Sequence, residues 1–118
     1  FPMDRNGNTD VLTMSEVLFE INTPLGFLVR CTQSYWTFIV TEKHPSLFGH
    51  ETEVKHALSD PDEIRRSKKD PDVYLFYQGV KPRWICAVTR KQGESGFLIT
   101  AYHTDSIKAG ESIWKKSK

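Results

Sequence analysis

The chain has 118 residues, of which 38% are hydrophobic and 26% charged, a composition typical of one globular domain with a single core. It contains no apolar run near the ~20 residues of a membrane span and no recognisable leader, so we expect a cytoplasmic protein. Residues 1–60 hold four basic and eight acidic residues, a balance of −4, whereas residues 61–118 hold twelve and seven, a balance of +5. If the domain has an anionic partner, we expect that partner to bind the second half.

The N-terminal part of the chain changes from polar to β-prone. Residues 1–15 lack apolar periodicity, which predicts a disordered lead-in before a single domain over residues 16–118. Val17–Ile21 and Phe27–Thr32 are short β-prone runs, and the five residues between them predict a hairpin. Gln33–Glu42 is compatible with a helix or a strand, and we favour a helix.

A second helix and then a series of strands are predicted from residue 51 onwards. Val54, Ala57 and Leu58 recur at i, i+3 and i+4, which predicts an amphipathic helix over Glu51–Ser59. After Pro61 the hydrophobic period changes to two. This period predicts four antiparallel strands, at Ile64–Ser67, Val73–Tyr77, Arg83–Arg90 and Phe97–Thr104.

The predicted fold is α+β, with an N-terminal hairpin and two helices packed on one face of a four-stranded antiparallel sheet. Within each strand the more apolar set of alternate residues is expected to face the helices. In the last two strands these sets are Trp84, Cys86 and Val88, and Phe97, Ile99, Ala101 and His103. The three tryptophans are expected to belong to the core.

Three segments carry a resemblance to a known family: LSDPDEIRRSKKDPDVYLFYQ (Leu58–Gln78), RWICAV (Arg83–Val88) and GFLITAYHTDSIKAGESIW (Gly96–Trp114). Together with the His44-Pro pair before the helix, they resemble small prokaryotic and phage-borne domains of the barnase–EndoU–colicin–RelE superfold. That resemblance implies a ribonuclease that needs no metal or other cofactor, and a toxin-like role. Catalytic residues differ between branches of the superfold, so the resemblance alone does not fix the catalytic set.

Metal-free cleavage of RNA requires a base near the attacking 2′-OH, cations beside the non-bridging oxygens and an acid at the leaving 5′-oxygen. Histidine is the commonest proton-transfer group at neutral pH, and arginine can bind phosphate through two parallel hydrogen bonds. We therefore expect Lys55 and Arg65 to hold the phosphate, His44 or His103 to transfer protons, and Thr104 to bind a non-bridging oxygen. The residues expected to contact RNA outside the catalytic set are Arg66, Ser67, Lys68, Tyr102 and Lys108.

Each of these residues also has a simpler structural interpretation. Lys55 is placed to pair with Glu51 on the helix surface, and Arg65 would protect a sheet edge. Thr104 would cap the turn that follows it, and His44 would be a solvated loop residue. Tyr102 would pack in the core instead of stacking on a base.

Other catalytic classes lack their motifs, since the sequence has no phosphate-binding glycine loop, no HExxH and no nucleophile elbow. The alternative hypothesis is a non-catalytic domain of the same fold that binds RNA or a protein. A toxin held by an antitoxin is a third possibility. RNA that is bound but left intact would favour the non-catalytic hypothesis.

Overall fold

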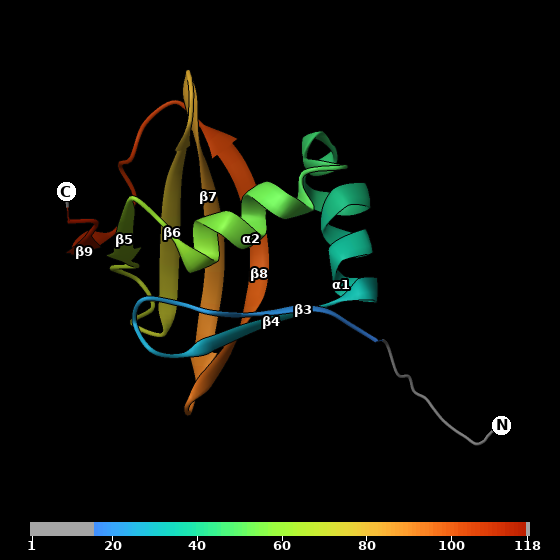
Figure 1. Ribbon diagram of the computed structural model, residues 1–118, viewed down its shortest axis with the longest axis horizontal. Coiled ribbons are helices and arrows are strands. Elements are labelled where there is room, and N and C mark those ends of the chain that lie inside the picture. Colours follow the sequence, from blue (N-terminus) through green and yellow to red (C-terminus); the bar gives the residue numbers. More distant parts are fainter. Residues whose placement is uncertain (1–15, 118) are drawn as a thin grey trace, which may run out of the picture.

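The computed structural model describes residues 16–117, so the prediction for residues 1–15 lies outside this part of the chain. With the labels of Figure 1, the elements in chain order are β3 (Val17–Asn22), β4 (Leu28–Thr32), α1 (Gln33–Phe38), the π-helical turn η1 (Ile39–Lys43), the 3₁₀ turn η2 (Pro45–Leu47), α2 (Glu51–Ser59), β5 (Glu63–Arg66), β6 (Val73–Val80), β7 (Arg83–Gln92), β8 (Ser95–Thr104) and β9 (Glu111–Lys115).

The α+β class, the hairpin and the two helices are confirmed, but the prediction of a four-stranded sheet is wrong. The sheet has seven strands in the order β3-β4-β8-β7-β6-β5-β9. The hairpin joins it through a short parallel pairing of β4 with β8, and β9 pairs with β5 at the other edge. Both additions satisfy backbone groups of β8 and β5 that a four-stranded sheet would leave unpaired at its edges.

Both helices lie on one face of the sheet, which we call the helix face. Figure 1 shows α2 running across the central strands and α1 beside β8. Thr32 caps α1, since its Oγ1 accepts a hydrogen bond from the Tyr35 N–H at 3.2 Å. The apolar stripe of α2 is completely buried, and α2 contacts β3, β6 and β7. Most of the core therefore lies between the helices and the sheet.

The predicted orientation of β7 is wrong. Ile85 and Ala87, not Trp84 and Cys86, face the helices, and both are fully buried in the main core. Apolarity did not distinguish the two sides of this strand because the opposite face of the sheet has a core of its own. That smaller core contains Leu75, Tyr77 and Cys86, with Trp84, Val88, Tyr102 and Ile107 packed against it.

In β8 the predicted orientation holds for the second half only. Ala101 is buried in the main core, but Phe97 is 38% exposed and Leu98 is buried instead. An irregularity opposite Val88 causes this change, because the register skips Ile99. The Ile99 carbonyl accepts hydrogen bonds from the Tyr35 hydroxyl at 2.8 Å and the Lys43 Nζ at 3.2 Å, which ties α1 and η1 to this edge.

Candidate nucleic-acid interface

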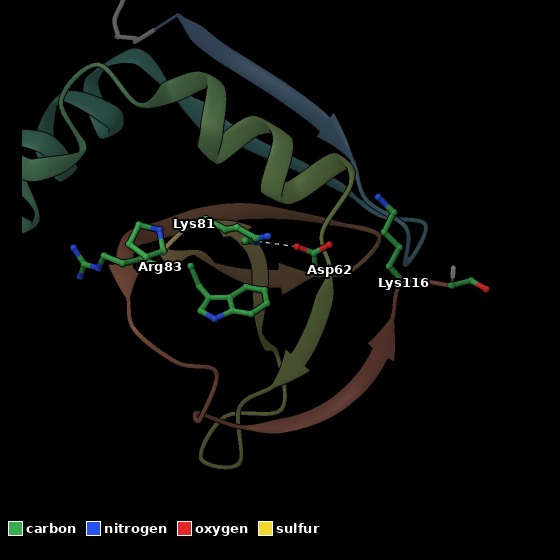
Figure 2. A pocket seen from close by; sticks show the side chains of 8 residues that line it. Asp62, Lys81, Arg83 and Lys116 are labelled. Atoms are coloured by element: carbon green, nitrogen blue, oxygen red, sulfur yellow. Dashed lines mark hydrogen bonds between the residues drawn. The ribbon is translucent and has the colours of Figure 1, made fainter.

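A concave basic pocket lies at one end of the sheet, where β6 turns into β7 and the chain leaves β9. Its volume is about 670 Å³. Figure 2 shows Asp62 and Lys116 on one side of this pocket, and Lys81 and Arg83 on the other. The complete lining, which we call the basic pocket, is Asp62, Gly79, Lys81, Pro82, Arg83, Trp84, Lys116 and Ser117.

The basic side chains of the pocket are only loosely committed to other partners. Lys116 pairs with Asp60 at 3.0 Å and Arg83 with Asp105 at 3.2 Å, and all four side chains are at least 47% exposed. Lys81 is exposed and has no ion-pair partner within residues 16–117. Exposed ion pairs contribute little free energy, so all three cations can turn to an anionic ligand.

The acidic residues beside the pocket have structural bonds. Asp62 Oδ2 accepts a hydrogen bond from the Gly79 N–H at 2.8 Å, which joins the start of β5 to β6. The hydrogen bond from Lys116 lowers the pKa of Asp60, and the charges of Lys116 and His56 act in the same direction. Asp60 is therefore ionised at neutral pH, where it forms an exposed ion pair with Lys116 at the rim of the pocket.

The small core continues from the pocket as a row of polar side chains on the face opposite the helices. Burial raises the pKa of Tyr77 and of the Cys86 thiol to about 12, and it also raises the pKa of Tyr102. All three groups are therefore neutral at physiological pH. His44 lies at the end of this row, with its ring 5.9 Å from that of Tyr102.

Thr100 precedes Tyr102 on the same face of β8, because both residues pair with outward-facing residues of β7. Its Oγ1 is buried and has no hydrogen-bond partner in the part of the chain that the structure describes. A buried hydroxyl without a partner is costly, so Thr100 lowers the stability of this part of the sheet.

A second cluster of titratable side chains lies on the helix face, where α2 begins. His50 Nδ1 is 2.8 Å from Glu53 Oε1, and His103 Nε2 is 3.6 Å from the same oxygen. The two imidazole rings are 5.3 Å apart and nearly perpendicular.

The five residues expected to be catalytic do not converge on one point. His103 faces the helices, whereas Thr104 is on the opposite face, paired with Trp84. Arg65 is also on that face, but β6 and β7 separate it from β8. Lys55 is on α2, on the helix face. The expected phosphate clamp of Lys55 and Arg65 is therefore not formed, since the sheet lies between them.

Two of these residues instead have structural roles that the sequence left open. The Arg65 guanidinium donates hydrogen bonds to the carbonyls of Ala109 and Gly110, at 2.8 and 2.9 Å, and pairs with Glu63 at 2.8 Å. The Thr104 hydroxyl donates to the Ser106 carbonyl at 3.2 Å and so closes the turn after β8. Arg65 anchors the loop that covers the small core.

The residues expected to contact RNA are distributed over the molecule. Arg66, Ser67 and Lys68 lie at the β5–β6 turn, at the other end of the sheet from the basic pocket. There the Arg66 Nε donates to the Pro71 carbonyl at 2.6 Å, and the Ser67 Oγ accepts from two backbone N–H groups of the turn at 3.3 Å. Lys108 is exposed in the loop after β8, and Tyr102 is half-buried beside His44.

Sequence reasoning missed most of the basic pocket and the partners of His103. Trp84 was assigned to the core, and His50, Lys81 and Lys116 were not singled out. One local signal could have found the pocket. The run Lys81-Pro-Arg-Trp84 places two cations beside an aromatic residue at a strand connection, which is a common composition of RNA-binding surfaces.

Within residues 16–117, no helix has the length and apolar character needed to cross a membrane. Comparison of the chain with protein-family models, with curated proteins and with solved structures finds no match. The resemblance to the barnase–EndoU–colicin–RelE superfold therefore stays a prediction.

Proposed function

We propose that this domain binds single-stranded RNA in the basic pocket. The observation that carries the proposal is the position of Trp84, half-buried in a concavity that also contains Lys81, Arg83 and Lys116. Single-stranded nucleic acids are bound by surfaces that combine cations for the backbone with an aromatic side chain on which a base stacks.

The shape and the polar groups of the pocket favour an unpaired base over a duplex. A duplex keeps its bases stacked, whereas a concavity of about 670 Å³ can receive one base that is turned out of the strand. Asp62 would accept hydrogen bonds from the amino group of that base, because carboxylates are acceptors only. Arg83 and Lys116 are held only in exposed ion pairs with Asp105 and Asp60, so these cations, together with Lys81, can turn to the phosphates of a bound strand.

The binding proposal can be tested by fluorescence anisotropy with a labelled single-stranded RNA. Lys81→Ala and Arg83→Ala should each weaken binding, and Trp84→Ala should weaken it by about 1–3 kcal/mol, the range for stacking of one base. With three phosphates neutralised, the logarithm of the binding constant should fall with the logarithm of salt concentration at a slope of roughly −2.

Lys91→Ala is the matched control, because Lys91 lies on β7 as Arg83 does, but at the opposite end of the strand. Its substitution should leave RNA affinity unchanged. Equal losses for Lys91→Ala and Arg83→Ala would show that RNA is attracted by net charge alone, and would contradict a specific pocket.

A second candidate function is metal-independent endoribonuclease activity in a toxin-like role. It is favoured by the position of His44, whose imidazole lies 5.9 Å from the ring of Tyr102 and is a group able to transfer protons. In this reaction the 2′-oxygen bonds to phosphorus as the bond to the 5′-oxygen breaks, leaving a 2′,3′-cyclic phosphate and a 5′-hydroxyl. His44 would take the proton from the 2′-OH and pass it to solvent, and a water would protonate the leaving 5′-oxygen.

Cleavage can be tested with long unstructured RNA in the presence of EDTA. We expect products that end in 2′,3′-cyclic phosphate, and loss of cleavage in His44→Ala with RNA binding retained. His56→Ala is the control, because His56 is an exposed histidine of α2. RNA that stays intact while it is bound would support the binding function alone.

We also propose where the protein is located in the cell and which kind of protein would inhibit it. Cys31 and Cys86 are both free and buried, which agrees with a reducing compartment such as the cytoplasm. An antitoxin-like protein would inhibit the domain by covering the basic pocket with acidic side chains. Co-purification of such a protein, and its release by Lys81→Glu, would support this regulation.

A further inference from the structure

Three side chains with metal-ligating atoms meet where α2 begins above the end of β8. They are His50, Glu53 and His103, and their nearest ligand atoms all lie within 4.8 Å of one another. The RNA-binding proposal uses none of them. His50 and Glu53 are one helical turn apart, whereas His103 comes from β8, which is separated from α2 by three other strands along the chain.

The backbone holds these residues on ordered elements. The His50 N–H donates to the Leu47 carbonyl at 2.8 Å, and the His50 carbonyl accepts from the Val54 N–H at 3.2 Å. His103 is paired in the ladder with Ile85, which is fully buried in the main core. Sites built on helices and strands keep their geometry better than sites built on loops.

We propose that His50, Glu53 and His103 form a binding site for a divalent transition metal, for which Zn²⁺ is the best match. Two imidazoles and one carboxylate are the ligands of a well-known class of zinc site, which keeps a fourth position for water. Mg²⁺ and Ca²⁺ prefer sites made of oxygen atoms, so they should bind this cluster poorly.

The separations of the ligand atoms fit such an ion after small rotations of the side chains. Ligand distances of about 2.0–2.2 Å in tetrahedral geometry place neighbouring ligand atoms roughly 3.3–3.6 Å apart. The 3.6 Å between Glu53 Oε1 and His103 Nε2 already fits, and it is too long for a hydrogen bond. The 2.8 Å contact of His50 with Glu53 would lengthen as the metal displaces the shared proton.

Exposure of the cluster allows an ion to enter. The side chains of His50 and Glu53 are 40% and 39% exposed, whereas that of His103 is 16% exposed. His103 therefore forms the inner wall of the site, and the open side leaves the fourth position to water. Cys31 and Cys86 are buried and do not compete for the ion.

Isothermal titration calorimetry of the metal-free protein with Zn²⁺ tests the proposal. We expect one equivalent of Zn²⁺ to bind, and Co²⁺ to give the visible absorption of a tetrahedral complex. Glu53→Gln and His50→Ala should each raise the Kd at least about tenfold, since loss of even a supporting residue costs roughly 10–100-fold in metal sites. Both positions are partly exposed, so these variants should fold, which circular dichroism can verify.

His56→Ala is the matched control. His56 is on the same helix and also faces a carboxylate, with its Nε2 3.6 Å from Asp60 Oδ2, but no third ligand completes that pair within residues 16–117. Its substitution should leave the Kd unchanged. Absence of Zn²⁺ binding would overturn the proposal and leave Glu53 as a hydrogen-bond partner that orients His50. Binding that persists in both Glu53→Gln and His50→Ala, or that is lost in His56→Ala, would also overturn it.

Discussion

On the helix face of β7, Ile85 and Ala87 are fully buried, whereas Trp84 and Val88 on the opposite face of the same strand are only half-buried. The helix face is closed by two helices and the hairpin, and most of its side chains are apolar. The opposite face is closed only in its middle, by the loop after β8, and it opens into the basic pocket at one end. One side of the sheet is therefore built mainly for stability, and the other combines a small core with a surface that can bind a ligand.

The largest expected effect on stability comes from truncating a side chain of β7, and the two faces of this strand should respond differently. Ile85→Ala should lower the free energy of unfolding by about 3 kcal/mol, because it leaves a cavity in the main core. Val88→Ala should cost about 1 kcal/mol, because the side chain is half-exposed and solvent can fill the space. Urea unfolding measures both, and equal losses would contradict the difference between the faces.

A substitution at Gly110 tests whether the loop over the small core is tightly packed. Its φ is +78°, and a Cβ at this position would lie 2.6 Å from the Arg66 carbonyl oxygen. Gly110→Ala should therefore cost about 2–3 kcal/mol, combining left-handed strain with a backbone clash. Gly93→Ala is the control, because Gly93 also has a positive φ but open space around its Cβ position, and it should cost only about 1–2 kcal/mol. A thermal unfolding series would compare the two variants.

Substitution of Arg65 separates the structural role that this residue has in the fold from the phosphate-binding role expected from the sequence. Arg65→Ala should destabilise the protein by about 1–2 kcal/mol, because two carbonyls of the loop lose charged hydrogen-bond donors. RNA affinity should change little. Arg66→Ala, at an exposed neighbouring position, should have a smaller effect on stability. Loss of RNA binding in Arg65→Ala at unchanged stability would restore the original assignment.

The smallest expected effect is that of the Asp70 carboxyl on the dependence of stability on pH. Asp70 lies at the end of the sheet away from the basic pocket. A hydrogen bond from the Asp72 N–H, followed by the contact with Arg90, lowers the pKa of Asp70 from 3.8. The folded state therefore binds this proton less readily than the unfolded state does. The contribution of the ionised Asp70 to the free energy of unfolding is fully present above the pKa of the unfolded state. It is lost as the pH falls through the lower pKa of the folded state.

Asp70→Asn should accordingly flatten the loss of stability below about pH 4, the region in which aspartate side chains titrate. The measurement is urea unfolding at a series of acidic pH values. Asp105→Asn is the comparison, because the Asp105 side chain is 90% exposed, and it should change the curve less. Identical curves for the two variants would argue against the hydrogen bond as the cause.

The local elements of the fold could be predicted because periodicity and turn residues act over a few positions. The stripe of Val54, Ala57 and Leu58 and the proline after it fix α2 without reference to the rest of the chain. The pairing of β4 with β8 joins residues 28–30 to residues 95–97, and no local pattern specifies such a distant partner. The β9 strand was missed for the same reason.

The candidate sites depended on information that alternation alone does not contain. Trp84 was assigned to the wrong face because both sides of β7 are apolar, and this error hid the pocket. His103 was correctly placed on the helix face, yet its neighbours His50 and Glu53 come from α2 and could be recognised only once the helix was docked. Arg65 was singled out for its charge, but its hydrogen bonds are to carbonyls of its own loop.

The parallel contact between β4 and β8 also has a consequence for the order of folding. The hairpin and both helices leave the ribosome before β8 exists, so the hairpin must wait for its neighbour in the sheet. The antiparallel run β6-β7-β8 contains mostly local pairings, which close quickly, and it can act as the template on which the N-terminal segment docks. Until then the inner side chains of the hairpin stay exposed to water, and the nascent chain is most vulnerable to aggregation in this interval.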